Sequence, residues 1–176
     1  MTMNDSWGYN PDDSHYKSAR RLIHTLAETA GKGGNLLLNV SPRGDGSLPP
    51  EQVERLRTVA EWMARHGSAI AGTAPGLEPW QFYGPTTQRS GDGTTTVYLH
   101  LLMRPYSSVD VRGLPVRRVE SVRAVGPGTP LAFSTRTAII DGLTVDPRGT
   151  VTIKVPPEVV DEYATVIAVE IADRTD

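Results

Sequence analysis

The most constraining feature of the chain is a short apolar run between two stretches of helical periodicity. Residues 35–40, NLLLNV, form a near-continuous apolar segment of the kind found where a strand is covered on both faces, as in parallel sheets. Apolar residues recur at intervals of three and four from Tyr16 to Ala30, and again from Val53 to Gly67. One strand and two helices cannot close a core alone, so this segment predicts an α/β unit from a larger barrel.

The residues between these elements carry helix-end and turn signals. Gly31, Gly33 and Gly34 follow the first helix, which is typical of a helix C-cap, whereas phosphate-binding glycines precede a helix. Residues 12–14, DDS, are expected to cap the start of that helix. The polar loop 41–49 leads to a second surface helix.

Beyond the second helix, the apolar period changes from about 3.6 to 2. We expect short strands, rich in Val, Ile, Thr and Leu, at residues 94–103, 109–112, 116–125, 137–140, 150–155 and 165–172. Gly, Pro and Asp turns separate them, and helical periodicity does not interrupt them. This pattern predicts an antiparallel β-sandwich.

The predicted fold class is therefore α/β plus all-β. We expect residues 1–72 to be the C-terminal end of a (β/α)8 barrel, residues 73–79 to be a linker, and residues 80–176 to be the sandwich domain. A complete barrel takes about 250 residues. Most of the barrel is thus expected to lie outside this sequence.

Composition excludes several classes of function. The formal net charge of −2, with interspersed signs, gives no field that favours nucleic acid or an anionic membrane. No run approaches the roughly 18 apolar residues of a membrane span, and the N-terminus lacks the pattern of a signal peptide. The absence of cysteine excludes disulfides and thiolate chemistry, and the scattered histidines show no metal-ligand spacing. We expect no metal and no cofactor.

Three residues are candidates for binding a ligand: Trp7, Tyr9 and Asn39. Trp7 and Tyr9 lie in a polar segment, where aromatic rings can stack on sugar faces while amides bind hydroxyls. The alternative is that Trp7 packs on the following helix. Asn39 ends the predicted strand, where βα-barrels place their chemistry, although the role of satisfying a buried backbone group is favoured over ligand binding. For Asp45, in the next loop, a turn role is favoured over catalysis.

No pair of carboxylates in the sequence satisfies the requirement of glycoside hydrolysis for two such groups across the scissile bond. We therefore assign no catalytic residue, and an active hydrolase that uses Asp5 or Asp45 is the least favoured alternative. A non-catalytic carbohydrate-binding or interaction module built on the sandwich is the second hypothesis. Against it, the sandwich sequence shows no cluster of aromatic residues typical of a sugar platform.

The segments TMNDSWGYN, YKSARRLI, KGGNLLLNVSP, DGSLPPEQVERL and EWMARHGSAIAGT together resemble the retaining α-L-fucosidases of glycoside hydrolase family twenty-nine. The resemblance covers residues 2–73 in one register, and the sandwich resembles that family's C-terminal β-domain more loosely. Ser41, where a Gly is expected, and Ala71, where a Tyr is expected, depart from the pattern.

This resemblance implies that residues 35–40 are the eighth barrel strand and that Trp7 and Tyr9 lie near the pocket rim. It also implies that the nucleophilic Asp and the acid–base Glu precede Met1, so that the chain alone is inactive. The implied substrates of the complete enzyme are fucosylated glycans. The implied partner is the N-terminal barrel portion, either in the same chain or, in a split enzyme, as a separate one.

Overall fold

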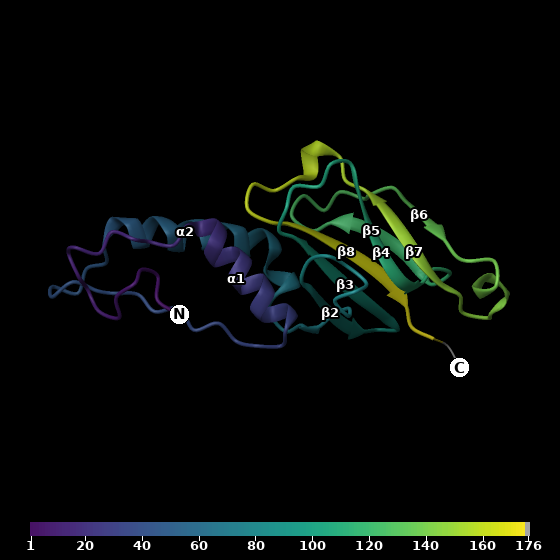
Figure 1. Ribbon diagram of the computed structural model, residues 1–176, viewed down its shortest axis with the longest axis horizontal. Helices are drawn as coiled ribbons and strands as arrows, with labels where there is room; N and C mark the ends of the chain where they lie inside the picture. Colours follow the sequence, from purple (N-terminus) through teal and green to yellow (C-terminus); the bar gives the residue numbers. More distant parts are fainter. Residues whose placement is uncertain (175–176) are drawn as a thin grey trace.

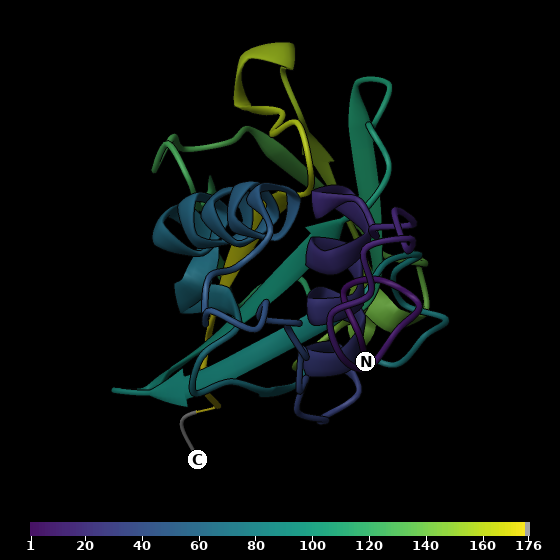
Figure 2. The ribbon, with the colours of Figure 1, turned by 90° about the vertical axis from the view of Figure 1, so that its left-hand side faces the viewer.

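Two helices, a five-stranded sheet and a three-stranded sheet form three successive layers (Figures 1 and 2). The computed structural model describes residues 1–174. The helices are α1 (Ala19–Gly31) and α2 (Pro50–His66), with short 3-10 turns η1 (Gly67–Ala69), η2 (Asp141–Leu143) and η3 (Pro157–Val159). The strands are β1 (Ala74–Pro75), β2 (Thr86–Gly91), β3 (Thr94–Leu101), β4 (Ser108–Pro115), β5 (Val119–Ala124), β6 (Phe133–Arg136), β7 (Arg148–Lys154) and β8 (Thr165–Ala172).

Every strand pair in the two sheets is antiparallel. The larger sheet has the order β1-β2-β3-β8-β5, and the smaller has the order β4-β7-β6. Apolar side chains from β3, β4, β5, β7 and β8 fill the space between the sheets, so these residues form a β-sandwich. The expectation of antiparallel sheets in the second half of the chain is confirmed.

The central strand β8 explains why the larger sheet is covered on both faces. Ile167 and Val169 point into the sandwich, whereas Val166 and Ala168 pack against the helices. All four side chains are fully buried. Because successive side chains of a strand alternate between faces, the nearly continuous apolar sequence of β8 suits a strand with a layer on each side. Figure 2 shows α1 and α2 lying across this sheet.

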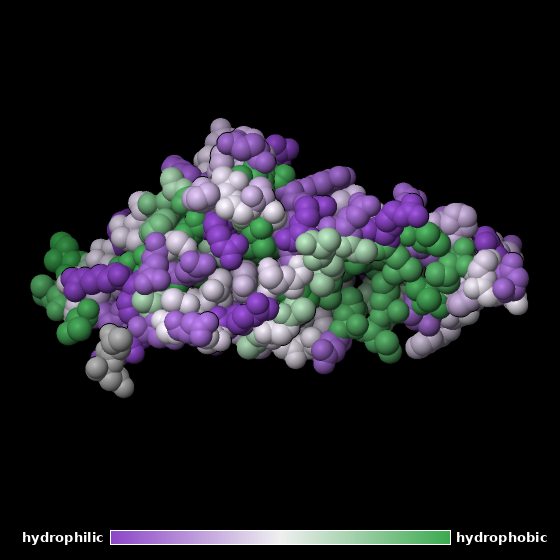
Figure 3. Space-filling view, turned by 180° about the vertical axis from the view of Figure 1, so that it is seen from behind, coloured by the Kyte–Doolittle hydropathy of each residue, from purple (hydrophilic) through white to green (hydrophobic). Residues whose placement is uncertain are grey.

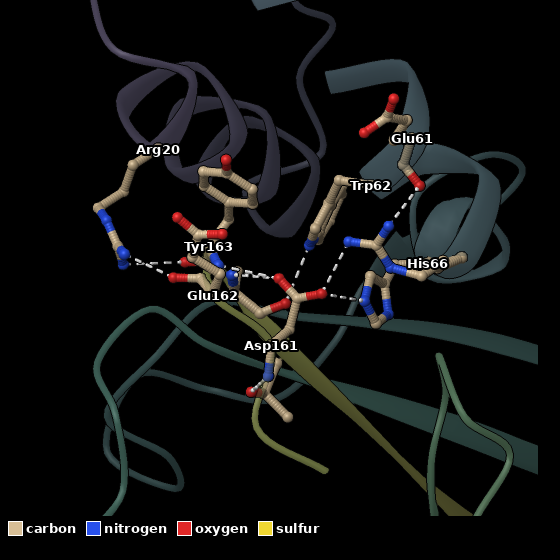
Figure 4. Close-up of polar contacts among 10 residues, drawn as sticks. Arg20, Glu61, Trp62, His66, Asp161, Glu162 and Tyr163 are labelled. Atoms are coloured by element: carbon tan, nitrogen blue, oxygen red, sulfur yellow. Dashed lines mark hydrogen bonds and ion pairs between the residues drawn. The ribbon is translucent and has the colours of Figure 1, made fainter. Parts of the chain in front are cut away.

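Polar contacts attach the helices to the loop that precedes β8 (Figure 4). The buried Trp62 indole donates a hydrogen bond of 2.9 Å to the carbonyl of Ala164. The Asp161 carboxylate accepts from Arg65 at 2.9 Å and lies 3.3 Å from His66 Nε2. Burial raises the pKa of Asp161, but the Tyr163 N–H, Arg65 and His66 lower it more, so this pKa lies below its usual value. The carboxylate therefore stays ionised and holds α2 in place.

Several predicted element boundaries were wrong. The cap of α1 is Ser18, whose hydroxyl accepts from the N–H of Arg21, and not residues 12–14. The strand expected at 137–140 lies at 133–136, and β2 was not predicted. The C-cap role of the glycines is confirmed, since the N–H groups of Gly33 and Gly34 donate to carbonyls in the last turn of α1.

The expected strand at residues 35–40 forms one parallel bridge, between Thr2 and Asn39, rather than a named strand. A ladder needs a neighbour on at least one side along its length, and Thr2 supplies only one such contact. Among residues 1–174, no further strand of the expected barrel accompanies it. Within the predicted linker, Ala74 and Pro75 form β1 and pair with β2. The domain boundary expected at residues 73–79 stays a prediction. Among residues 1–174, no helix is both long and apolar enough to cross a membrane.

Candidate functional site

The N-terminus and residues 36–40 run side by side in the same direction. Alongside the Thr2–Asn39 bridge, the Asn39 N–H donates to the Met1 carbonyl at 2.9 Å, and the Met3 N–H donates to the Asn39 carbonyl at 3.2 Å. Helix α1 connects these two segments in the sequence. The three pieces therefore make a βαβ arrangement, in which a helix joins two parallel extended segments.

The two faces of residues 36–40 differ in exposure. Leu36, Leu38 and Val40 are partly buried, whereas Leu37, which alternates with them, is 82% exposed. This alternation is the one expected of a strand. Apolar surface gathers in Figure 3 over the half of the molecule that holds the helices and the N-terminal segment. The face is thus open to solvent at Leu37, whereas Asn39 on the same face is partly buried.

Asn39 holds the backbone of Trp7. Its side-chain Nδ2 donates to the Trp7 carbonyl at 2.8 Å, and the Ser41 hydroxyl lies at 3.5 Å from the same oxygen. The buried Ser41 is fixed in turn, because its N–H donates to Gln52 Oε1 at 3.0 Å. The structure therefore brings together two of the three predicted binding residues, Trp7 and Asn39, and gives Asn39 a positioning contact.

The two aromatic side chains of the N-terminal segment are accessible. Trp7 is 80% exposed, which excludes the alternative that it packs on the following helix, and Tyr9 is 42% exposed. The guanidinium of Arg43 lies over the Tyr9 ring, 5.6 Å from its centroid, at cation–π distance. Trp7, Tyr9, Asn39 and Arg43, together with the buried Ser41 that contacts the Trp7 carbonyl, form a region that we call the N-terminal rim. Ser41 and Arg43 were not predicted as members of it.

Asp13 fastens the loop that carries Trp7. Its carboxylate accepts from the Ser6 hydroxyl at 2.7 Å and from the backbone N–H groups of Asp5 and His15, both at 3.1 Å. The Ser6 hydrogen bond, helped by these backbone donors, outweighs burial and lowers the pKa of Asp13. Asp5, Asp13 and His15 offer possible metal-ligand atoms within 4.8 Å of one another. The contacts of Asp13 give it a structural role in the loop.

Asp45 has the turn role favoured from the sequence. Its Oδ1 accepts from the Ser47 N–H at 2.9 Å and from the Ser47 hydroxyl at 2.7 Å. The Ser47 hydroxyl is the main reason why the pKa of Asp45 is lowered. An acid catalyst needs a raised pKa, so Asp45 is unsuited to that role.

Comparisons with known proteins agree with the resemblance noted in the sequence. The sequence model described as alpha-L-fucosidase matches residues 1–68. The α-L-fucosidase of Branchiostoma floridae is 35% identical over 116 residues, which cover 62% of this chain and 25% of that protein. The chain thus spans about a quarter of the length of this curated relative.

Solved structures extend the similarity over nearly the whole chain. The α-L-fucosidase isoenzyme 1 of Paenibacillus thiaminolyticus is 28% identical with a TM-score of 0.82, covering 98% of this chain and 39% of its own. The α-fucosidase of Thermotoga maritima in complex with fucose is 29% identical with a TM-score of 0.70, covering 96% and 38%. Both helices and the sandwich therefore have counterparts in fucosidases.

Proposed function

We propose that this chain, which belongs to the α-L-fucosidase family, supplies the C-terminal part of a retaining glycosidase that removes terminal α-L-fucose from glycans. In this proposal, residues 1–72 close a (β/α)8 barrel, residues 73–79 lead out of it, and residues 80–176 form its β-sandwich domain. The fucose bound to the Thermotoga maritima neighbour supports fucosylated glycans as the substrate class.

The observation that carries the proposal is the parallel bridge between Thr2 and Asn39, with α1 as the connection. A βα-barrel is built by repeating this unit, with helices outside and strand residues alternating between the barrel interior and the helices. Leu36 and Leu38 are on the covered side, so Leu37 and Asn39 would face the interior. In the complete barrel, the other strands would then cover Leu37, which is exposed in this chain.

The N-terminal rim would lie at the active-site end of this barrel. In βα-barrels, the ends of the strands and the loops that follow them surround the substrate. Asn39 and Ser41 are at such an end and hold the Trp7 backbone. The exposed rings of Trp7 and Tyr9 could then stack on the apolar face of a sugar, with Asn39 near enough to orient the segment.

The chemistry itself would come from the preceding barrel strands. Retaining hydrolysis needs a nucleophilic carboxylate and an acid–base carboxylate about 5–5.5 Å apart. Among the carboxylates near the rim, Asp13 accepts hydrogen bonds within its loop and Asp45 within its turn, while Asp5 is exposed beside His15. We therefore assign the nucleophile and the acid–base to residues outside this chain, which would be inactive alone.

Release of nitrophenol from 4-nitrophenyl α-L-fucoside tests the proposal. The gene region should be expressed twice, once as the 176-residue chain and once with any in-frame coding sequence upstream of Met1. Only the longer protein is expected to hydrolyse the fucoside. Trp7→Ala in the longer protein should raise KM. Hydrolysis by the 176-residue chain, or an inactive longer protein that contains a folded barrel, would contradict the proposal.

A further inference from the structure

A second aromatic surface lies on the sandwich, beside the edge strand β4. A groove of about 490 Å³ is lined there by residues 79–83 and by Ser108, Asp110 and Arg112 of β4. Trp80 is 65% exposed and Tyr83 is 52% exposed. The rings of this surface lie together at residues 80–83, but their exposure and the polar groups of β4 beside them could not be read from the sequence. We call this surface the β4 groove.

Trp80 is held in place by the backbone of β4. A Cβ atom at position 113 would lie 2.7 Å from Trp80 Cη2, so glycine alone lets the ring approach this closely. Gly113 has a φ of +67° and lies where the β4–β7 register shifts between Val111 and Leu114. Such bulges at a sheet edge often redirect side chains. The ring of Trp80 is thus exposed and lies against the backbone of β4 at Gly113.

The loop that carries Trp80 is bound to the same strand. The Arg112 N–H donates to the Gln81 carbonyl at 2.9 Å, and Gln81 Nε2 donates to the Arg112 carbonyl at 3.0 Å. Gln81 Oε1 also accepts from the Glu78 N–H at 3.0 Å. Phe82 is buried in the sandwich core and contacts Tyr83, with ring centroids 4.5 Å apart. These contacts hold the backbone that carries both exposed rings against β4 before any ligand binds.

Polar groups stand next to the rings. Asp110 and Arg112 alternate with the buried Val109 and Val111, so both side chains are on the outer face of the sheet. Asp110 Oδ1 accepts from the Thr152 hydroxyl at 2.7 Å, which orients the carboxylate and leaves its other oxygen for a ligand. The groove therefore combines a carboxylate acceptor and a guanidinium donor with exposed aromatic faces.

We propose that the β4 groove is a non-catalytic binding site for a neutral pyranose unit of a glycan, stacked on Trp80 and hydrogen-bonded through its hydroxyls to Asp110 and Arg112. A sugar ring has an apolar face of C–H groups and an edge of hydroxyls, and the groove offers one partner for each. Because the loop that carries the ring is hydrogen-bonded to β4, its backbone loses little conformational freedom on binding, which favours affinity. The nearly balanced charge of Asp110 and Arg112 favours a neutral ligand.

The β4 groove is separate from the N-terminal rim. The start of α1 adjoins the rim segment, because the Lys17 N–H donates to the Met3 carbonyl at 2.8 Å. The end of α1 adjoins the groove segment, because a second hollow is lined by Gly31 and Lys32 together with Pro79 and Tyr83. A 13-residue helix is about 20 Å long. The groove would therefore hold a glycan away from the rim.

Binding of the 176-residue chain to an array of neutral oligosaccharides, built from fucose, galactose, glucose or mannose, tests the proposal. We expect binding to at least one of them. Trp80→Ala should weaken this binding by about tenfold or more, as expected of a central aromatic contact. Asp110→Ala should also weaken it, and Trp80→Phe should retain much of it.

Tyr106→Ala is the matched control, since it removes a fully exposed aromatic side chain that lines neither the β4 groove nor the N-terminal rim, and it should leave this binding unchanged. Far-UV circular dichroism should show the wild-type fold for each variant. Failure of the folded chain to bind any array member at millimolar concentrations would overturn the proposal, as would undiminished binding by Trp80→Ala. Neither result bears on fucoside hydrolysis, which uses the longer protein and the N-terminal rim.

Discussion

The sandwich buries its large apolar side chains, whereas the N-terminal segment leaves one of them exposed. In the sandwich, Leu99, Ile153 and Ile167 come from different strands and are all 0% exposed. In the N-terminal segment, Leu37 is 82% exposed although it belongs to the most apolar run there. An amphipathic layer is stable when another layer covers its apolar face. The sandwich provides both of its layers, whereas residues 35–40 have only the helix side covered.

The helices belong to both regions. Their inner faces are complete, because Ile23 and Trp62 pack with Tyr98 and Val166 of the large sheet. The buried interface between the helices and the large sheet therefore contrasts with the exposed face that carries Leu37. Perturbing each side separately tests this contrast.

Trp62→Ala should have the largest effect on stability, because Trp62 lies in the buried interface between the helices and the large sheet. Trp62 is 0% exposed and its indole donates to Ala164, so truncation creates a cavity and leaves that carbonyl unpaired. We expect a loss of about 3–5 kcal/mol in the free energy of unfolding, measured with urea. The control Trp7→Ala, on the exposed side, should change it by less than about 0.5 kcal/mol. Equal losses of unfolding free energy in the two variants would contradict the difference between the buried interface and the exposed face.

Lowering the pH should weaken the interface between the helices and the large sheet. His100 is fully buried, and burial lowers its pKa from 6.5 to about 4. Thr87 donates to the Ala69 carbonyl and lies 3.1 Å from His100 Nε2, so this nitrogen carries the proton of the neutral ring and Nδ1 would have to accept a second one. Between pH 6.5 and about 4 the unfolded chain binds more protons, so stability falls as the pH falls.

At about 1.4 kcal/mol per pH unit, the loss attributable to His100 across this window is about 3 kcal/mol. His66, whose pKa burial also lowers despite the attraction of Asp161, adds a loss in the same direction. Urea unfolding at several pH values measures the slope, and His100→Leu should make it shallower. An unchanged slope in that variant would show that His100 is not the group responsible.

Asn39→Ala should have a smaller effect, confined to the N-terminal rim. It removes the hydrogen bond to the Trp7 carbonyl, worth about 1 kcal/mol. The unfolding free energy should therefore fall by about that amount, and hydrogen exchange at residues 7–9 should accelerate. Asn35→Ala, at an exposed position of the same segment, is the control and should leave both unchanged. Unaltered exchange in Asn39→Ala would mean that Asn39 does not position Trp7.

Much of the fold could be read from local patterns, and the errors have physical causes. The apolar stripes located both helices, and alternation located β3, β4, β5, β7 and β8. β2 escaped because only Thr86 and Thr87 are buried in it. Asp92 and Gly93, both at positive φ between β2 and β3, form a hairpin signal that would have revealed it.

The error at β6 came from the apolar residues that follow it. Ile139 and Ile140 suggested a strand but are 93% and 76% exposed in the segment between β6 and β7. The strand lies just before them, because backbone pairing with β7 sets the register, with Thr135 opposite Val151. Tertiary pairing thus overrode a local apolar signal.

The candidate sites differ in how far the sequence could predict them. Trp7 and Tyr9 lie in one polar segment, so both could be named as candidates from the sequence, but the exposure of Trp7 became known only from the structure. The contact of Asn39 with Trp7 depends on the parallel approach of the N-terminus, which spacing does not encode. The β4 groove depends on the pairing of residues 79–83 with an edge strand. Sites assembled by such pairing become visible once the topology is known.

The accessibility of position 37 tests the central claim, that the open face of residues 35–40 is part of a barrel. The chain has no cysteine, so Leu37→Cys places a single thiol in it. In the 176-residue chain this thiol should react with a disulfide reagent at nearly the rate of a free thiol. The comparison is a longer protein that includes the preceding barrel strands, with the reaction of its other thiols subtracted. There the reaction at position 37 should be at least about a hundredfold slower, because a core position reacts only when the protein unfolds. Equal reactivity in the two proteins would contradict the account.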